Sequence, residues 1–561
     1  MRKTLLLFFV LSLIFSNVFA ADTKFDISPV NPDLVKYLEL QKTGHLKKLT
    51  DNGYPLGYVP HSLKYSINTV NISAKAGALP EVFDLRETGN LTPVKDQSTC
   101  GACWTFASYG SIESRWLSLG VGGFDMSEQN LKNGNGFEID HCGGGNAVIT
   151  TAYLVRGDGP ISEEDDPYDV DNGDYVSGLT PLGYVPDARF LPNDPSTIKQ
   201  IIYDYGAIYT DMYWDGDYYN SNNNTYFCDV SADSGTNHAV LLVGWNDTLQ
   251  TAGGEGAWII RNSWGTSFGD SGFFYISYND SSVNSGPAFW PNRMDYEDNS
   301  IIHQYDEFGA LAGIGCDNSR GYGLVKFTMD KAQQITKLGV WQNSPNSTVA
   351  FEIYSDFNGS SLSGMLASIG DQTCSYPGYY TFSLSSPLEL NSGDDIYVKV
   401  IYNCPGEKYP VPVETAIDGY ANPTIETGKF WVSCNGNSWT AFGGGTEYEY
   451  DLCIKAYGLT EATAVDDNGQ INTPQSFRLN QNYPNPFNPS TTIKYSVAQK
   501  AVVNITVFNT LGQPVRELVN MEQAQGEYQV SFDAGELASG VYYYRLKSGK
   551  FTEIRKMIYL R

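Results

Sequence analysis

The sequence has little positive charge. It contains 36 Lys and Arg against 63 Asp and Glu, a formal net charge of -27, and no basic block offsets the excess of acid. Nucleic acids and anionic membrane surfaces bind proteins through clustered Lys and Arg, so this balance argues against either as a partner. The acidity is that expected of a soluble protein outside the cell.

Long apolar runs are absent after the first residues. Arg2 and Lys3 precede an apolar run from Leu5 to Phe15, and Val18-Phe19-Ala20 supplies a small-x-small cleavage pattern. This run is short for a membrane span. The pattern therefore predicts a signal peptide over residues 1–20, cut after Ala20, with export through the Sec route. The alternative is a retained N-terminal anchor.

Cysteines are few and odd in number, and none follows Cys453. In an exported chain cysteines tend to pair, and an odd count leaves one thiol that needs a reason. The nine are Cys100, Cys103, Cys142, Cys228, Cys316, Cys374, Cys404, Cys434 and Cys453.

The length is too great for one core, and three or four domains are expected. Hydrophobic patterns change along the chain from mixed helical and strand periods to strict alternation. We therefore predict a multidomain fold in which an α+β domain is followed by two all-β sandwich domains. The predicted parts are a signal peptide (1–20), a leader (21–78), the α+β domain (79–295), a first β-sandwich (296–459), a polar linker (460–474) and a second, smaller β-sandwich (475–561).

Several short elements are predicted within these parts. Apolar residues with a 3.6-residue period after Cys103 indicate a helix, and a helical turn or two is expected from Asp33 to Leu40. Buried strands are predicted at 239–243 and 258–260. Alternating strands are predicted at 349–353, 396–402, 493–497, 503–507 and 542–546.

Three segments carry residues of one chemistry. They are Pro93-Val94-Lys95-Asp96-Gln97-Ser98-Thr99-Cys100-Gly101-Ala102-Cys103-Trp104, Asn237-His238-Ala239-Val240 and Asn262-Ser263-Trp264-Gly265. A thiolate attacks an amide carbonyl well, whereas a thiol does not. Cys103 at a helix N-terminus would have its negative charge favoured by the helix dipole. His238 would exchange its proton, and Asn262 would orient the imidazole.

Gln97 is the candidate oxyanion donor. Its side-chain N–H, with the backbone N–H of Cys103, could bind the negative oxygen that develops during attack. His141 is the other histidine within residues 79–295, and it lacks the Asn-x-Ala-Val context of His238. His238 is therefore preferred as the base.

These segments resemble the papain family of cysteine peptidases over roughly residues 79–280. Further matches are Ser127-Glu128-Gln129, Cys142-Gly143-Gly144-Gly145, and Trp264-Gly265 followed by Gly269, Gly272, Phe273 and Tyr275. The resemblance implies a two-lobed fold with the site in the cleft, a Cys100–Cys142 disulfide, and no metal or organic cofactor. It also implies that Gly145 binds the backbone of the substrate's P2 residue and that Trp264 shields the His–Asn hydrogen bond. The implied substrate-binding set is Gly144, Gly145, Asn146, Thr236, Ala239 and Trp264.

The sequence departs from the family pattern in three places. Cys228 lies near a family disulfide position, but no cysteine follows Asn262 inside the domain, so its expected partner is Cys316 or a later thiol. Asn146 stands where the S2 pocket often has a larger apolar or aromatic residue. The leader is short and lacks the long charged helix common in papain pro-segments.

The two C-terminal parts have resemblances of their own. Residues 303–458 resemble a lectin-like domain, through 342–345, 351–354, 379–382 and 409–414. Sugar binding and a purely structural spacer are both open. Residues 478–561 resemble the C-terminal sorting domain of type IX secretion, through 478–489, Leu511-Gly512-Gln513 and 538–543. A plain adhesive immunoglobulin-like module is the alternative.

Together these features predict a secreted or cell-surface cysteine peptidase, made as a zymogen, with a mature N-terminus near Ala78. Peptides or proteins are the expected substrates, a glycan is a possible ligand of the lectin-like part, and the type IX machinery is an expected partner. Nucleic acid is not expected as a partner, and the chain is expected to be monomeric. Two alternatives stay open: a glycan- or protein-binding surface protein with an inactive papain-like scaffold, and a peptide ligase using the same residues.

Overall fold

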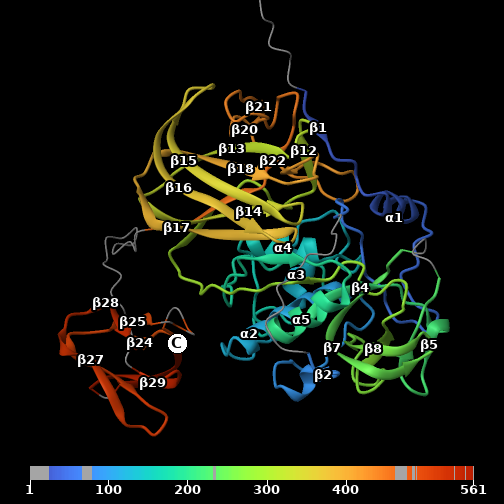
Figure 1. Ribbon diagram of the computed structural model, residues 1–561, viewed down its shortest axis with the longest axis horizontal. Coiled ribbons are helices and arrows are strands. Elements are labelled where there is room, and N and C mark those ends of the chain that lie inside the picture. Colours follow the sequence, from blue (N-terminus) through green and yellow to red (C-terminus); the bar gives the residue numbers. More distant parts are fainter. Residues whose placement is uncertain are drawn as a thin grey trace, which may run out of the picture. The chain divides into compact units, whose positions relative to one another are not determined.

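The computed structural model describes residues 24–65, 79–230, 235–460 and 477–559, apart from positions 483, 484, 486, 488, 536 and 550. The predicted signal peptide, the mature N-terminus near Ala78 and nearly all of the predicted linker lie outside the described residues. The chain forms two compact units, one ending at Thr460 and one beginning at Glu461. Figure 1 shows the elements of both units.

Five α-helices of the first unit are described, and most begin at a side-chain cap. Ser127, Asn146 and Asp194 each accept hydrogen bonds from backbone N–H groups of the first turn that follows, which fixes where three of the helices start. The helices are α1 (Pro32–Lys42), α2 (Cys103–Ser118), α3 (Glu128–Gly134), α4 (Ala147–Val155) and α5 (Pro195–Tyr205), with 3₁₀ turns at Leu85–Glu87 and Gly216–Tyr218. The helix predicted after Cys103 is α2, and most of its residues are buried.

Short strands and one long hairpin form the β part of the same region. They are β2 (Val82–Asp84), β3 (Ala188–Phe190), β4 (Ile208–Met212), β5 (Tyr219–Asn220), β6 (Thr225–Tyr226), β7 (His238–Thr251), β8 (Gly254–Arg261), β9 (Phe273–Ser277) and β10 (Ala288–Phe289). β7 pairs antiparallel with β4 on one side and β8 on the other. His238 therefore begins β7, and Asn262 directly follows the end of β8.

Thirteen strands follow residue 295 and make the predicted first β-sandwich. They are β11 (Ser300–His303), β12 (Ala312–Gly315), β13 (Arg320–Thr328), β14 (Gln333–Gln342), β15 (Ser347–Phe357), β16 (Leu362–Cys374), β17 (Gly378–Leu390), β18 (Asp395–Asn403), β19 (Val411–Glu414), β20 (Phe430–Ser433), β21 (Thr440–Phe442), β22 (Asp451–Leu452) and β23 (Ile454–Thr460). Six of them form one sheet in the order β16-β15-β18-β13-β20-β21. The core between the layers is made of apolar residues that alternate along these strands.

The α+β region and this sandwich share a sheet. β3 pairs with β10 on one side and with β17 on the other, so that Ala188 lies opposite Tyr379. A hydrophobic core also crosses the boundary, because Trp104 and Tyr153 belong to the same buried cluster as Trp341. Backbone pairing and a common core make the first unit one body.

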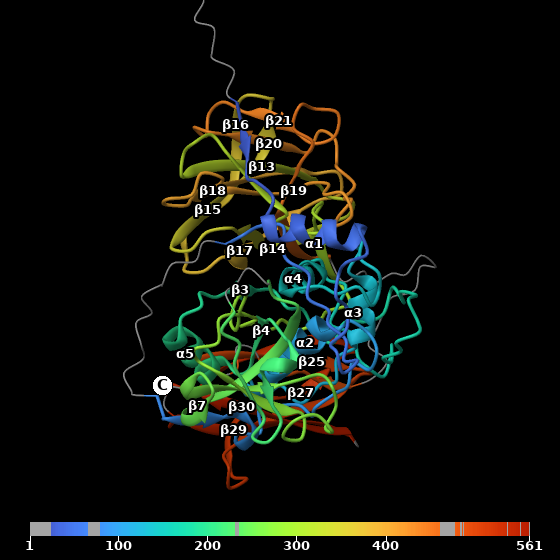
Figure 2. The same cartoon turned by 90° about the vertical axis from the view of Figure 1, so that its right-hand side faces the viewer.

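The leader lies on both regions of the first unit. β1 (Asp26–Ile27) pairs antiparallel with β12, and Leu34 and Tyr37 of α1 enter the core that includes Trp104. Figure 1 shows α1 at the side of the first unit, to the right of α4; Figure 2 turns this side toward the viewer. The predicted helical turn at 33–40 is thus part of an 11-residue helix, which begins after an Asn31 cap with Pro32 at its first position.

The second unit contains two small sheets. Its strands are β24 (Arg478–Leu479), β25 (Ser490–Val497), β26 (Ala501–Phe508), β27 (Pro514–Gln523), β28 (Gly526–Asp533), β29 (Gly540–Ser548) and β30 (Phe551–Tyr559). The sheet orders are β24-β25-β28 and β27-β26-β29-β30. Apolar residues of both sheets form one core, so this unit has a hydrophobic core of its own. Of the helices in the described ranges, none has the length and apolar character needed to cross a membrane.

Candidate active site

Cys103 is the first residue of α2. Its side chain is 0% exposed, and the backbone N–H of Ala239 donates to its Sγ at 3.4 Å. The backbone N–H groups of Gly57 and Trp104 also interact with this sulfur. A sulfur at a helix N-terminus, surrounded by N–H donors, lies where negative charge is stabilised.

His238 and Asn262 are joined by a hydrogen bond. Nε2 of His238 lies 2.9 Å from Oδ1 of Asn262, and the backbone N–H of Ser263 donates to the same oxygen at 2.9 Å. A carbonyl oxygen only accepts, so Nε2 carries a proton and Nδ1 of neutral His238 is an acceptor. Nδ1 has no hydrogen-bond partner among the described residues, and it is therefore free to take a proton.

Trp264 covers the imidazole. Its ring stacks on His238 with centroids 4.7 Å apart, and Tyr54 of the leader stacks on the Trp264 ring at 4.5 Å. An apolar cover of this kind keeps water from the His238–Asn262 hydrogen bond.

Gln97 is held on both ends of its amide. Its Oε1 accepts from the Ser263 hydroxyl at 2.5 Å, and its Nε2 donates to the carbonyl of Cys100 at 2.8 Å and to that of Pro55 at 3.4 Å. In this state one donor of the amide is directed at a leader carbonyl. Removal of the leader would release that N–H for another oxygen.

Burial decides the protonation states of Cys103 and His238. Loss of contact with water raises the pKa of the Cys103 thiol to about 12 and lowers the pKa of the His238 imidazole to about 4. Both groups are therefore neutral near pH 7 in this structure. The leader contributes to this burial, since Gly57 is in contact with Cys103.

The leader runs through the site as an extended segment. The N–H of Gly145 donates to the carbonyl of Gly57 at 2.9 Å, and the N–H of Val59 donates to the carbonyl of Gly145 at 3.0 Å. On the other side, the N–H of Tyr58 donates to the carbonyl of Asn237 at 3.2 Å. Residues 57–59 therefore hydrogen-bond the backbone of Gly145 on one side and of Asn237 on the other.

The other predicted substrate-binding residues lie around this segment. Thr236 interacts with the Tyr58 hydroxyl, and Gly144 is so close to the leader that a Cβ there would lie 2.7 Å from the Gly57 carbonyl oxygen. Asn146 caps α4 with its Oδ1 and donates from Nδ2 to the Val59 carbonyl at 2.9 Å. Ala239 and Trp264 contact Cys103 and His238 as described above.

Two disulfides are present, Cys100–Cys142 beside the site and Cys316–Cys434 in the first β-sandwich. The expected pairing of Cys228 with Cys316 or a later thiol is wrong, because Cys316 pairs with Cys434 and Cys228 is a free, buried thiol. Five thiols are free among the described residues instead of one. Those other than Cys103 lie in apolar surroundings, where a thiol packs as a small hydrophobic side chain.

His141 lies beside the first disulfide. Its carbonyl is near the sulfur of Cys100, and its ring lies against Gly173. His238 is the histidine that the fold places beside Asn262, and Ala239, the residue after it, contacts Cys103.

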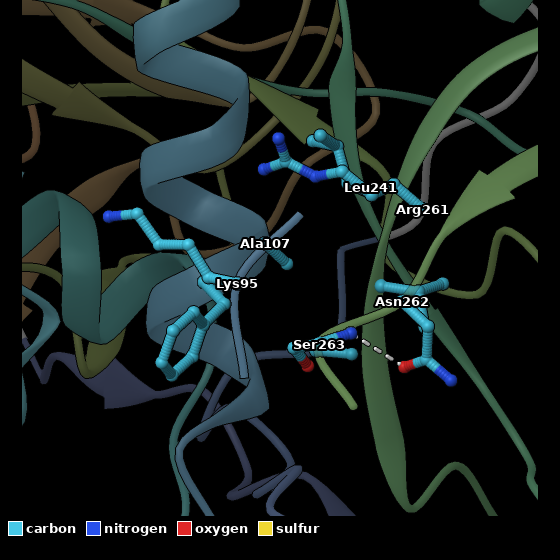
Figure 3. A pocket seen from close by; sticks show the side chains of 9 residues that line it. Lys95, Ala107, Leu241, Arg261, Asn262 and Ser263 are labelled. Carbon is cyan, nitrogen blue, oxygen red and sulfur yellow. Dashed lines mark hydrogen bonds between the residues drawn. The ribbon is translucent and has the colours of Figure 1, made fainter. Parts of the chain in front are cut away.

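A small cavity lies behind Asn262, between α2 and the β7–β8 pair. It measures about 10 Å³ and is lined by Lys95, Phe106, Ala107, Ala239, Val240, Leu241, Arg261, Asn262 and Ser263. Figure 3 shows the Ser263 N–H donating to Asn262 at its edge. A cavity of this size holds at most one water molecule, so it belongs to the packing behind the site and does not bind substrate.

Sequence reasoning missed two residues that the structure brings to the site. Asp211 lies in the fully buried strand β4 beside β7, and Tyr58 of the leader reaches it. The signal was present for Asp211, because an acidic residue inside an apolar strand next to a predicted site strand is unusual. Tyr58 had no such signal, since its segment is rich in Gly and Pro and shows no periodicity.

Comparison with known proteins matches three families along the chain. Residues 79–288 match the papain family cysteine protease, residues 302–458 the lectin like domain, and residues 481–560 the secretion system C-terminal sorting domain. These matches occur in the order that the resemblances predict.

Curated relatives match the first of these regions. A cysteine protease of Blomia tropicalis is 32% identical over 217 residues, which are 36% of this chain and 62% of the mite protein. Cathepsin K of Mus musculus is 31% identical over 232 residues, 39% of this chain and 67% of the mouse protein. A viral cathepsin of Spodoptera litura multicapsid nucleopolyhedrovirus is 32% identical, with 59% of its length covered. The chain thus spans about three fifths of the mite and viral relatives.

One solved structure shares the fold across two regions. It contains the cysteine protease and lectin-like domains of Cwp84, a surface layer associated protein of Clostridium difficile. The TM-score is 0.65 at 23% identity, with 78% of this chain and 99% of that chain covered. The predicted combination of an α+β papain-like domain and a β-sandwich is confirmed as a fold.

Proposed function

We infer the activity of this chain from one premise: the chain belongs to the papain family of cysteine proteases. We propose that it hydrolyses peptide bonds with Cys103 as nucleophile, His238 as base and acid, and Asn262 as the residue that orients His238. The observation that carries this proposal is the Nε2–Oδ1 hydrogen bond at 2.9 Å, which leaves Nδ1 free.

The proposed reaction uses Cys103 and His238 in turn. The Cys103 proton passes to Nδ1 of His238, and Sγ attacks the carbonyl carbon of the scissile bond. The imidazolium then gives its proton to the leaving nitrogen as the C–N bond breaks, which leaves a thioester on Cys103. Water adds to the thioester while His238 takes its proton, and the free thiol returns as the carboxylic acid leaves.

Gln97 supports the oxyanion in this proposal. Its amide is fixed by Ser263 on one end, and its N–H already points at a carbonyl of the bound leader. A fixed donor costs little reorganisation during the reaction, which is why such donors stabilise developing charge well. The N–H of Cys103 would supply the second donor.

The proposed zymogen state rests on the path of the leader. Residues 57–59 occupy the cleft, and the nucleophile and base are both buried and neutral beneath them. We propose that residues 21–78 are a pro-segment whose removal opens the site. The proposed peptidase domain is 79–295, the lectin-like domain 296–459, the linker 460–474 and the sorting domain 475–561.

Hydrolysis that depends on Cys103 is the result that tests the proposed activity. A ligase would use the same residues but transfer the acyl group to an amine, so added amine nucleophiles would appear in its products. A binding scaffold would need neither the free Nδ1 of His238 nor the N–H donors around Cys103, and these features favour an enzyme.

We propose that residues 475–561 direct export to the outside or surface of the cell by the type IX route, after the Sec route. The support is the match to a secretion sorting domain together with a separate core and no cysteine that could tie it to the first unit. The chain is proposed to act as a monomer.

A chain ending at Thr460 should therefore fold and hydrolyse peptides as fast as the full chain, because Thr460 closes the last strand of the first unit. In the native host it should stay in the periplasm. Cell fractionation with a peptidase assay measures both results, and the full chain is the control. Surface display of the shortened chain in normal amounts would contradict the sorting role.

The lectin-like region offers a surface for a glycan. Phe357 lies with its ring 5.0 Å from that of Trp431, 5.8 Å from that of Tyr397 and 6.2 Å from that of Trp439. Tyr397 on β18 and Trp431 on β20 are partly exposed, and so is Trp439, which directly precedes β21. Exposed aromatic rings give sugars an apolar stacking face with polar edges, so we propose that a glycan binds here.

Replacing Trp431 with alanine should weaken polysaccharide binding by about fivefold, since one ring contact is worth on the order of 1 kcal/mol. Quenching of tryptophan fluorescence by a panel of soluble polysaccharides measures this. Met365→Ala, at an exposed position of the same sheet, is the matched control. Equal binding by both variants would show that the aromatic cluster is not the site.

A further inference from the structure

A buried carboxyl lies beside the cleft, and the proposed mechanism does not use it. Asp211 is 3% exposed on β4 and lies opposite Ala239 in the β4–β7 register. Ala239 is the residue whose N–H donates to Cys103. A carboxyl this deep in the protein is costly unless donors meet it.

Two tyrosine hydroxyls lie close to the Asp211 carboxyl, that of the fully buried Tyr209 on the same strand and that of Tyr58 in the leader. Even so, Oδ1 has no hydrogen bond of good geometry among the described residues. Buried polar groups are nearly always paired, so a carboxyl at this depth depends on the hydroxyls that reach it. Gly286 keeps the space open, because a Cβ there would lie 2.4 Å from Oδ2 of Asp211.

The leader places a tyrosine at this point. The Tyr58 hydroxyl interacts with the Asp211 carboxyl and with the Thr236 side chain. Its own N–H donates to the carbonyl of Asn237, while its neighbours Gly57 and Val59 hydrogen-bond Gly145, so that Tyr58 lies opposite Gly145 in a parallel bridge. A substrate residue that takes this place opposite Gly145 would project its side chain into the same space.

We propose that Asp211 is a specificity-determining residue of the subsite that Tyr58 now fills. With Asp211 there, the enzyme prefers substrates that have tyrosine, not phenylalanine, at the position that pairs with Gly145. This inference rests on the proposed peptidase activity. Phenylalanine would fill the same volume but bring no hydroxyl to the carboxyl. A site built around a hydroxyl discriminates strongly against the analogue that lacks it, because its own polar groups are then left unpaired.

A neutral donor fits this subsite better than a cation. Burial raises the pKa of Asp211 to about 8, so the neutral carboxyl is favoured at neutral pH. The groups that face it are the hydroxyls of Tyr58 and Tyr209, and the nearby Cys103 thiol is also neutral. An arginine or lysine side chain would have to lose its hydration and ionise the carboxyl in order to pair with it.

The test measures cleavage of three fluorogenic dipeptides by the activated enzyme. The second residue of each dipeptide, at the scissile bond, is the same, and the first is tyrosine, phenylalanine or arginine. We expect kcat/KM for tyrosine to exceed that for phenylalanine by about tenfold. Asp211→Val should bring this ratio to about one, while Asp211→Asn, which keeps an acceptor oxygen, should keep part of it. Met212→Leu, the next position of β4, is the matched control and should keep the whole preference.

Casein hydrolysis separates the possible failures. If casein is not cleaved, the proposed activity fails. If casein is cleaved but phenylalanine or arginine is preferred to tyrosine, the role of Asp211 is overturned.

A second measurement needs no activity. In the uncleaved Cys103→Ala chain, Tyr58→Phe should lower Tm, and it should do so less when Asp211 is valine. Additive effects of the two substitutions would also overturn the inference, because contacting residues are coupled.

Discussion

Replacing Cys103 with alanine should lower kcat for peptide hydrolysis by on the order of 10⁵–10⁶-fold, as removal of a nucleophile does in enzymes that form an acyl intermediate. We expect no other described thiol to take its place, because backbone N–H donors surround the sulfur of Cys103, whereas the other free cysteines are buried side chains of the hydrophobic cores. His238→Ala should have nearly the same effect, since the thiol then has no base. Asn262→Ala should cost less, because it removes orientation and leaves both reacting groups.

The matched control is Cys228→Ala. Cys228 is also a free, buried thiol of the same domain, but it packs with Tyr226 and Phe274 in a different core. This variant should keep full activity. Peptide hydrolysis by the activated chain, with circular dichroism and Tm to verify folding, measures both. Undiminished hydrolysis by folded Cys103→Ala would end the proposal that this residue is the nucleophile.

Periodic segments could be predicted from the sequence because they record burial directly. The helix after Cys103 and the strands at 239–243 and 258–260 each carry apolar residues with the period of their element, and the structure has them as α2, β7 and β8. The alternating runs at 349–353 and 396–402 lie in β15 and β18 for the same reason. The short motifs around Cys103, His238 and Asn262 also indicated the chemistry, because each of these residues is recognised from the residues next to it in the sequence.

Long-range contacts could not be predicted in this way. The partner of Cys316 is Cys434, which is distant in sequence, and only the folded sandwich brings the two together. The pairing of β3 with β17 depends on two short segments that have no signal of their own. Asp211 became part of the candidate site only when the leader was seen to place Tyr58 beside it.

The leader contains one part that its own sequence pattern predicts and one part that long-range contacts determine. Its helix α1 has a recognisable cap and proline, whereas residues 54–60 follow a path set by their contacts with the cleft and not by their own pattern. Position 57 of the leader requires a glycine. A Cβ at this position would lie 2.0 Å from the carbonyl oxygen of Gly101, a backbone atom next to the Cys100–Cys142 disulfide. The cleft wall therefore has little freedom to move aside.

Gly57→Ala should consequently make the uncleaved chain reactive. Overpacking at a fixed wall costs about 1–3 kcal/mol, which weakens leader binding by up to about 10²-fold. Once residues 56–58 leave, water reaches Cys103 and His238. The burial that now raises the pKa of Cys103 to about 12 and lowers that of His238 to about 4 is relieved, and the thiolate becomes accessible near pH 7. The rate of labelling by a thiol-directed epoxide should rise by about 10–10²-fold over that of the parent chain.

Mass spectrometry of the intact chain measures this rate on uncleaved molecules and maps the adduct to Cys103. Gly53→Ala is the matched control, because it makes the same change in the same segment where a Cβ meets nothing within 4 Å. Its positive φ of 83° makes it a demanding control, since the backbone strain is present without the clash. Labelling of Gly57→Ala at the rate of the parent and of Gly53→Ala would show that the leader does not hold the site closed. Fast labelling of Gly57→Ala alone would show that contact of residue 57 with the cleft wall keeps the thiol protected.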